Sequence, residues 1–296
     1  MLTERPFTGP DDLPALHEVA RASMKAAKPL SIPHVGDVTW GLYQHEPELA
    51  TPKVTRIFER EGLPVAFGIL WLPQTLQCAI HPQHRDDEVY GALLDWFESS
   101  AGDALDGGLD VQLLESEASL RGALERRGYE LLQSGTRFEH RVRSLADAVE
   151  EPVLPHGYTL RDVRDDDLER RVEVHRAAFH PSKVTAPAYR LLRTLPPYRA
   201  DLDLVVEAPD GSFAAYALVW LDEENGIGEL EPVGTHPAHQ RLGLGKAVCL
   251  EACRRLRALG ADTAVVYSLA GYHAGRLYGN AGFEPVDHHI EFRRSP

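Results

Sequence analysis

Residues 236–260 read HPAHQRLGLGKAVCLEACRRLRALG, and this stretch carries the strongest structural signal in the sequence. Two glycines, Gly243 and Gly245, stand where a long helical pattern begins, beside the hydrogen-bond donors Gln240 and Arg241. A glycine-rich turn that opens a helix offers backbone N–H groups and the positive end of the helix dipole. Without Cβ atoms, it also lets an oxygen approach the backbone. The stretch therefore predicts a phosphate-binding loop, with a plain structural turn as the alternative.

Two other phosphate-binding motifs do not fit this stretch. The Walker loop requires a glycine five residues before Gly-Lys and a serine or threonine after it, where this sequence has Gln240 and Ala247. The dinucleotide fingerprint requires a third glycine where Val248 stands. These departures disfavour a nucleoside triphosphate or NAD as the ligand.

The segments around the loop alternate between strand and helix patterns. Runs of apolar or alternating residues predict strands, and apolar residues at helical spacing predict helices. Leu244, Val248 and Leu256 share one face of the helix that follows the loop. The predicted order is strand 158–163, helix 164–179, strands 202–208, 213–221 and 228–236, helix 244–259, strand 262–269, helix 271–282 and strand 288–294. This order predicts the α+β class, with a mixed sheet flanked by helices.

The chain of 296 residues contains two copies of this plan. HPQH at 81–84 matches HPAH at 236–239, and DDL at 11–13 matches DDL at 166–168. GYE matches GFE and AFGILWL matches AYALVWL in the same order along the chain. Several ordered matches at a nearly constant offset indicate a duplication. We therefore predict domains at 1–145 and 156–296, joined by a linker at 146–155 that is rich in charge and proline.

The composition of the chain limits the kinds of partner and the cellular compartment that we expect. The formal net charge of -14 argues against nucleic acid and anionic membranes, which both require a basic face. The three cysteines, Cys78, Cys249 and Cys253, form no CxxC pair, and no signal peptide or membrane span stands out. We expect a cytoplasmic protein without a metal site. Cys249 and Cys253 are four residues apart, so a zinc pair is the alternative to small packing residues on a helix.

Two motifs together resemble the GNAT superfamily of N-acetyltransferases. QRLGLG is similar to the family's Q/R-x-x-G-x-G/A pyrophosphate loop. RLYGNAGFEPV resembles its second signature, with matches at Ala274, Leu277, Tyr278, Gly282 and Phe283. The resemblance covers residues 156–294 and, through the repeat, extends weakly to 1–140. It implies two tandem acyl-CoA N-acyltransferase domains, of which the C-terminal one uses acetyl-CoA to acetylate a primary amine. The acidic residues near the expected cleft, Glu229, Glu231 and those of DEEN at 222–225, indicate a small cationic molecule as the acceptor.

The resemblance also implies roles for individual residues. Tyr278 matches the tyrosine that protonates the leaving sulfur, and Glu231 is the candidate base. The alternatives for Glu231 are a solvated carboxylate or a contact for a cationic substrate, with ordered water as the base. Glu229 lies on the same strand face by alternation, and Pro232 and Gly234 suit the family's strand bulge. The implied coenzyme contacts are Val233, Thr235, Gln240, Arg241, Leu242, Gly243, Leu244, Gly245, Lys246, Gly271 and Ala274; Gly271 replaces the family's asparagine.

The N-terminal copy lacks the corresponding chemistry. Its residues at the positions of Gly243, Gly245, Glu231 and Tyr278 are, in that order, Glu88, Tyr90, Leu76 and Leu124. Acidic side chains would repel phosphates, so we predict a degenerate domain that binds no coenzyme. The segment PHVGDVTWGLY at 33–43 has no counterpart in the other copy. It is either a packed loop with a core tryptophan or a lid or interdomain wall of the amine pocket.

A second class of function stays open at this point. A non-catalytic acyl-CoA-binding or interaction module would also retain the loop, and Gly271 gives this alternative some support. The sequence identifies neither the amine, the acyl length nor the oligomeric state.

Overall fold

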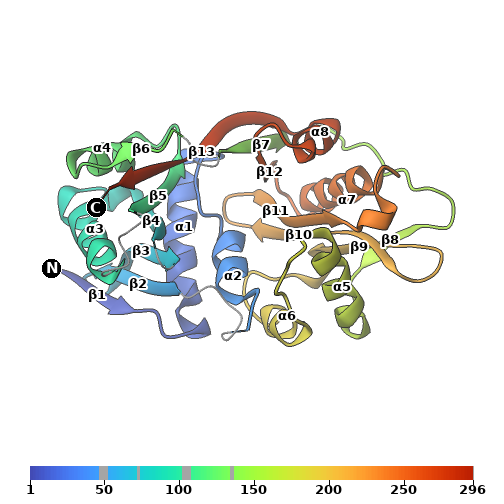
Figure 1. Ribbon diagram of the computed structural model, residues 1–296, viewed down its shortest axis with the longest axis horizontal. Helices are drawn as coiled ribbons and strands as arrows, with labels where there is room; N and C mark the ends of the chain where they lie inside the picture. The colour runs from blue at the N-terminus through green and yellow to red at the C-terminus, as the bar shows by residue number, and fades with distance from the viewer. Residues whose placement is uncertain (47–52, 72–73, 102–107, 134–136, 296) are drawn as a thin grey trace. The chain divides into compact units, whose positions relative to one another are not determined.

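The computed structural model describes residues 1–46, 53–71, 74–101, 108–133 and 137–295 (Figure 1). Two compact units make up the chain, and neither is contiguous in sequence. Unit 1 comprises Met1–Val35, Thr51–His140 and Val286–Pro296, and unit 2 comprises Gly36–Ala50 and Arg141–Pro285. Each unit therefore contains a segment from the other half of the sequence. Within the described ranges, no helix has the length and apolar character needed to cross a bilayer.

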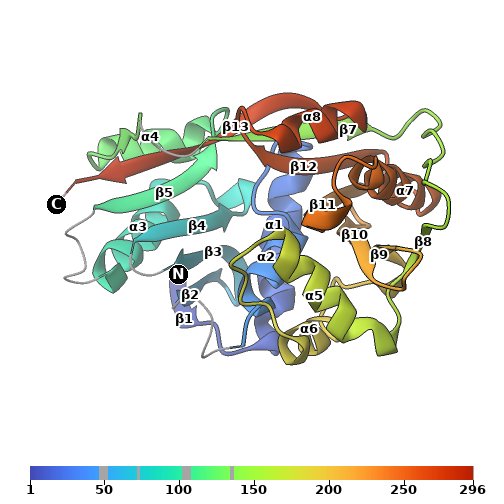
Figure 2. The same ribbon diagram turned by 45° about the vertical axis from the view of Figure 1, so that its right-hand side comes forward.

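Unit 2 is built on a mixed sheet with helices on both faces, as the sequence predicts. Its strands follow the order β8–β9–β10–β11–β12, in which only β11 and β12 run parallel. Figures 1 and 2 show α7 on one face of the sheet and α5 on the other. The elements are β8 (Thr159–Asp162), α5 (Leu168–Ala178), α6 (Ala186–Leu192), β9 (Asp203–Glu207), β10 (Phe213–Asp222), β11 (Ile227–Thr235), α7 (Leu244–Ala258), β12 (Thr263–Leu269) and α8 (His273–Asn280).

Strand β10 divides the core of unit 2 into two layers. All ten of its residues are buried, which is typical of a central strand covered on both faces. Ala217 and Val219 pack in the cluster that contains α7, while Leu218 and Trp220 pack with α5 and α6. Cys249 and Cys253 are buried in the α7 layer as free thiols, as expected for small packing residues.

The segment 33–43 is a helix rather than the loop that the sequence suggested. Helix α2 (Val35–Tyr43) belongs to unit 2 from Gly36 onward. A Cβ atom on Gly36 would lie 2.2 Å from the Trp220 side chain, so only glycine allows this close packing. Trp40 is 6% exposed and packs with Leu218 and Trp220, which confirms the predicted core tryptophan.

Unit 1 repeats the element order of unit 2, which supports the predicted duplication. Its sheet has the order β1–β2–β3–β4–β5–β13, with β4 and β5 parallel. The strand β13 closes the sequence of the second copy but pairs with β5 in unit 1. The elements are β1 (Leu2–Pro6), α1 (Leu13–Ala27), β2 (Lys53–Arg60), β3 (Leu63–Trp71), β4 (Thr75–Ile80), α3 (Asp87–Ala101), β5 (Leu109–Leu114), α4 (Ala118–Arg126), β6 (Glu130–Leu131) and β13 (Glu284–Arg294). Strand β7 (Phe138–Ser144) begins in unit 1 and belongs to unit 2 from Arg141 onward.

The segment 146–155, predicted as a linker, belongs to unit 2. Val149 of this segment and Leu145 just before it are buried in the α7 layer, and their carbonyl oxygens accept hydrogen bonds from Arg254 and Arg257, respectively. The domain boundaries proposed from the repeat and the compact units of the structure therefore describe different properties. The repeat describes how the sequence is organised, and the units describe which residues pack together.

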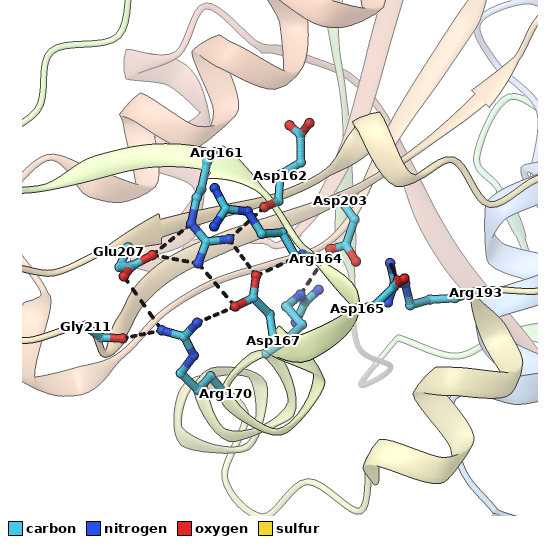
Figure 3. A network of polar contacts seen from close by, with 11 residues as sticks. Arg161, Asp162, Arg164, Asp165, Asp167, Arg170, Arg193, Asp203, Glu207 and Gly211 are labelled. Atoms are coloured by element: carbon cyan, nitrogen blue, oxygen red, sulfur yellow. Dashed lines mark hydrogen bonds and ion pairs between the residues drawn. The ribbon is translucent and has the colours of Figure 1, made fainter.

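An ion-pair network joins β8 to the start of α5 (Figure 3). Asp167 is 1% exposed and accepts hydrogen bonds from Arg161 at 2.5 Å, from the backbone N–H of Arg164 at 2.8 Å, and from Arg170. Burial alone would raise the pKa of Asp167, but these donors lower it to about 2, against 3.8 for the isolated side chain. A lowered pKa stabilises the fold above the unfolded pKa, and this stabilisation is lost as the pH falls through the folded value.

We expect Asp167→Asn to lower the free energy of unfolding at pH 7 by about 2 kcal/mol. The natural protein should lose this stabilisation as the pH falls from about 4 to 2, and the variant should lose less stability over the same range. Urea unfolding at pH 7 and pH 3 measures both effects. Asp165→Asn is the matched control, because Asp165 pairs with Arg193 while 99% exposed and an exposed pair contributes little. Equal losses in the two variants would contradict the assignment.

Candidate active site

The loop before α7 has the backbone geometry of an anion-binding turn. Gly243 has φ +81° and precedes α7 without any side-chain cap, which leaves the first N–H groups of the helix available to an anion. Arg241 has φ +64°, a conformation that costs a non-glycine residue about 1–3 kcal/mol and is concentrated at functional sites. Gln240, Arg241, Leu242 and Gly243 are exposed, so a ligand can reach them.

Gly245 lies in the first turn of α7 and fits tightly against its neighbours. A Cβ atom on Gly245 would lie 3.2 Å from the Thr235 hydroxyl oxygen and 3.2 Å from Leu277. The loop, the end of β11 and helix α8 therefore meet at this point. Leu244, another residue of the predicted loop, is buried. Its side chain anchors the start of α7, while its backbone N–H faces the N-terminal end of the helix.

Strands β11 and β12 separate just before this loop. Their parallel pairing, in the described part of the chain, covers only Ile227–Glu229 on β11. The pairing of β11 with β10 shifts register between Ala217 and Val219, which confirms the predicted bulge. The bulge frees the carbonyl oxygen of Glu231, and the indole N–H of Trp220 donates to it at 2.6 Å. Val233 and Thr235 follow the bulge, so their β12-facing edge borders the gap between the strands.

Tyr278 lies on α8 and packs in the same buried layer as α7. It is 6% exposed and packs edge-on against Phe283, with 6.2 Å between ring centroids. Burial raises its pKa well above the usual tyrosine value, and nearby Glu231 and Tyr216 act in the same direction. The phenol therefore stays protonated at neutral pH and is available as a proton donor. Ala274 is half-buried on the same helix, and Gly271 precedes it with φ +77°.

Two carboxyl groups of β11 have raised pKa values. Burial is the main cause for both, and it raises the pKa of each to about 8. The charge of Glu231 adds to the shift at Glu229, and the charge of Asp37 adds to the shift at Glu231. Glu229 is fully buried, whereas Glu231 is partly exposed. Of the two, Glu231 is thus the carboxyl group that an incoming amine can reach.

Asp37 is the site residue that sequence reasoning did not identify. It lies on α2 close to Glu229 and, like Tyr267 of β12, acts to lower the pKa of Glu229, against the larger effect of burial and of the Glu231 charge. The charge of Asp37 in turn raises the pKa of Glu231. Asp37 thus contributes a negative charge beside Glu231. The only signal in the sequence was the lack of a counterpart for this segment in the other copy.

Lys246 lies one turn into α7 and is held by an acidic residue of the preceding segment. Its ammonium group is 2.9 Å from the carboxylate of Glu150. Both side chains remain largely exposed, so the pair is weak and a stronger anion can replace Glu150. The side chain of Lys246 can therefore contact a bound phosphate, as its predicted role in coenzyme binding requires.

Unit 1 shows what happened to the same region in the other copy. The N-terminus of α3 is capped by Asp86, whose carboxylate accepts from the N–H of Val89 at 3.0 Å. Asp87 and Glu88 add two more acidic residues in the first turn. A carboxylate thus occupies the position that the uncapped Gly243 leaves open in unit 2. This cap supports the prediction that the first copy binds no phosphate.

The gap between parallel strands survives in unit 1 as a small cavity. Its volume is about 40 Å³, and residues of β4 and β5 line it together with Arg85 and Tyr90. Arg85 pairs with Glu117 at 3.3 Å. A cavity of this size holds a few water molecules, far less than a coenzyme arm requires.

Comparison with known proteins places this arrangement in a family. The model of the acetyltransferase (GNAT) family matches residues 169–283, which lie in unit 2. Mycothiol acetyltransferase of Nocardioides sp. is 27% identical over 308 residues, and the alignment covers 96% of this chain and 98% of that protein. Mycothiol acetyltransferase of Kineococcus radiotolerans is 30% identical over 225 residues, covering 73% of this chain and 71% of that protein.

Solved structures show the same fold over the whole chain. A tandem GNAT protein from the clavulanic acid biosynthesis pathway superposes with a TM-score of 0.66 at 16% identity, covering 99% of this chain and 98% of that chain. A GCN5-related N-acetyltransferase from Sphaerobacter thermophilus superposes with a TM-score of 0.62 at 20% identity, covering 99% of this chain and 95% of that chain. These likenesses concern the fold, and they confirm the predicted two-domain architecture.

Proposed function

The chain belongs to the GNAT family of acetyltransferases, and from this premise we propose how unit 2 uses acetyl-CoA to acetylate a small cationic amine. The observation that carries the proposal is the meeting of three features in unit 2. These are an uncapped helix N-terminus, a gap between splayed parallel strands, and a carboxyl group beside a neutral tyrosine. Together they can bind the coenzyme, accept a proton from the amine and donate one to the leaving sulfur.

The coenzyme side of the site follows from the loop and the gap. The N–H groups at the start of α7, together with Arg241 and Lys246, would hold the pyrophosphate. The edge of β11 after the bulge would bond the pantetheine arm, with the N–H of Val233 directed at the thioester oxygen. Acetyl-CoA supplies an activated acetyl group and a thiol leaving group. Gly271 offers no side-chain contact, so this position would contribute through its backbone alone.

The remaining chemistry consists of proton transfers by residues of unit 2. Glu231 accepts a proton from the ammonium group of the acceptor, which makes the nitrogen nucleophilic. The nitrogen forms the amide bond to the acetyl carbon while the carbon–sulfur bond breaks. The Val233 N–H stabilises the negative charge on the oxygen during this exchange. Tyr278 donates a proton to the leaving sulfur and regains one from the second proton that the nitrogen loses, while the proton on Glu231 is released to water.

The acceptor side of the site selects a positively charged molecule. Asp37 provides a negative charge close to Glu231. The full-length relatives are named for mycothiol. We therefore propose that the acceptor is an amine of the same class, such as the unacetylated amine form of mycothiol. Three free, buried cysteines support a reducing, cytoplasmic setting.

A panel of amines tests this proposal, with release of coenzyme thiol as the readout. We expect small cationic amines, including the amine form of mycothiol, to react, and peptide lysines to react poorly. Asp37→Asn should raise KM for a cationic amine about 10-fold and leave the affinity for acetyl-CoA unchanged. Glu223→Gln is the matched control, because Glu223 is an exposed acidic residue that pairs with Arg199. Exclusive reaction with peptide lysines would contradict the small-molecule assignment.

A further inference from the structure

The ring of Tyr216 covers β11 at Gly234, the residue after Val233, and its position follows from the pairing of β10 with β11. Tyr216 is directly opposite Gly234 on the neighbouring strand. A Cβ atom on Gly234 would lie 2.6 Å from the Tyr216 ring and 2.8 Å from Ala178 of α5. The sheet face at Gly234 is therefore closed by an aromatic ring and a helix. Gly234 follows Val233, whose N–H is proposed to face the thioester oxygen.

The ring of Tyr216 is fixed from two sides. Its hydroxyl group lies 2.7 Å from Nδ1 of His175, and the guanidinium carbon of Arg171 lies 3.8 Å from the ring centroid. Tyr216 and Arg171 are both fully buried.

Arg171 is itself anchored deeper in the core of unit 2. Its Nε donates to Asp203 at 3.1 Å, and the hydroxyl group of Tyr189 donates to the same carboxylate at 2.7 Å. A ring held by a hydrogen bond and a stacked cation cannot rotate away without breaking both contacts. Tyr216 is consequently a rigid wall rather than a mobile side chain.

We propose that Tyr216 limits the transferred acyl group to acetyl. This inference rests on the proposed function, since it uses the thioester position beside Val233. An acetyl group ends in one methyl group and stops short of the ring. A propionyl or butyryl group adds carbon atoms that meet the ring of Tyr216 or the close-packed surface of Ala178. Tyr216 then determines donor specificity without taking part in the proton transfers.

Acyl-CoA thioesters of increasing length test the proposal with the full chain. For the natural protein, kcat/KM should fall about 10-fold or more with each added methylene group, because a filled pocket rejects extra volume at about this level. Tyr216→Phe keeps the ring and should keep this order of preference. Tyr216→Leu removes the ring and should raise the ratio of butyryl to acetyl activity at least about 10-fold. Calorimetric titration with the same thioesters gives a second readout of the pocket.

Tyr189→Leu is the matched control for Tyr216→Leu. It disturbs the same Arg171–Asp203 cluster, yet Tyr189 lies on α6, away from Gly234. Its acyl preference should stay that of the natural protein. If Tyr216→Leu does not fold, the acyl preferences of the natural protein and of Tyr216→Phe still test the inference.

Two outcomes overturn the inference in distinguishable ways. A natural protein that uses butyryl-CoA as well as acetyl-CoA overturns the inference alone, as does a Tyr216→Phe variant that loses the preference. A natural protein that binds none of the thioesters overturns both the inference and the proposed function.

Discussion

Tyr278→Phe is expected to lower kcat by about 10²- to 10⁴-fold while leaving the affinity for acetyl-CoA within about 2-fold. The substitution removes one oxygen atom from a buried ring whose packing against Phe283 is otherwise preserved. The leaving thiolate then has to take its proton from water. Steady-state kinetics with the best amine of the panel measures kcat, and calorimetry measures the affinity.

The same variant separates catalysis from binding alone. A non-catalytic acyl-CoA-binding module would show no thiol release with any amine, in the natural protein or in the variant. Tyr272→Phe is the matched control, because Tyr272 is 57% exposed and lies just before α8. An unchanged kcat in Tyr278→Phe would remove Tyr278 from the reaction.

Glu231→Gln is expected to lower kcat/KM by about 10²- to 10³-fold and to abolish its dependence on pH below neutrality. The pKa of Glu231 is raised to about 8, first by burial and then by the charge of Asp37. Since a base works only when deprotonated, kcat/KM of the natural protein should rise with pH and level off above about pH 8. A pH profile of kcat/KM at low amine concentration, measured for the natural protein and for Glu231→Gln, tests both predictions.

Asp37 and Glu229 provide the decisive comparisons for this profile. Asp37→Asn removes a negative charge that opposes ionisation of Glu231, so the rising limb should move to lower pH. Glu229→Gln removes the other carboxyl group of β11 with a raised pKa, which is fully buried, and should retain the limb. Loss of the limb in Glu229→Gln but not in Glu231→Gln would identify Glu229 as the base instead.

The parts of the site that the sequence predicts are those whose residues lie close together along the chain. The glycines at 243 and 245, the basic residues beside them and the helix that follows form one local device, so a short stretch reveals it. The bulge was predictable because Pro232 cannot donate to a strand ladder. Tyr278 was identified because it belongs to a signature of the same kind.

The acceptor side could not be predicted, since it depends on contacts between distant segments. The sequence of α2 contains two glycines and three β-branched residues, which weaken a helix in isolation. The helix forms because Gly36 and Trp40 pack against Trp220, far along the chain. Asp37 reaches Glu229 and Tyr267 only as a consequence of this packing.

For a similar reason, the sequence does not predict that the last strand, β13, pairs in unit 1. Strand β13 continues the second copy in sequence, and its alternating pattern fits a sheet edge in either unit. Its pairing with β5 from His289 to Arg294 decides that it belongs to unit 1. A pattern predicts that a strand forms, but not which strand becomes its partner.

The central claim is that one coenzyme site, in unit 2, serves the whole chain. Calorimetric titration of the full-length protein with acetyl-CoA tests it most directly, with Gly243→Glu as the paired sample. That substitution introduces Glu, the residue that the sequence repeat aligns with Gly243, and Gly243 has φ +81° at the uncapped start of α7. We predict one site per chain in the natural protein and no measurable binding in the variant. Two sites per chain, or undiminished binding in Gly243→Glu, would contradict the account.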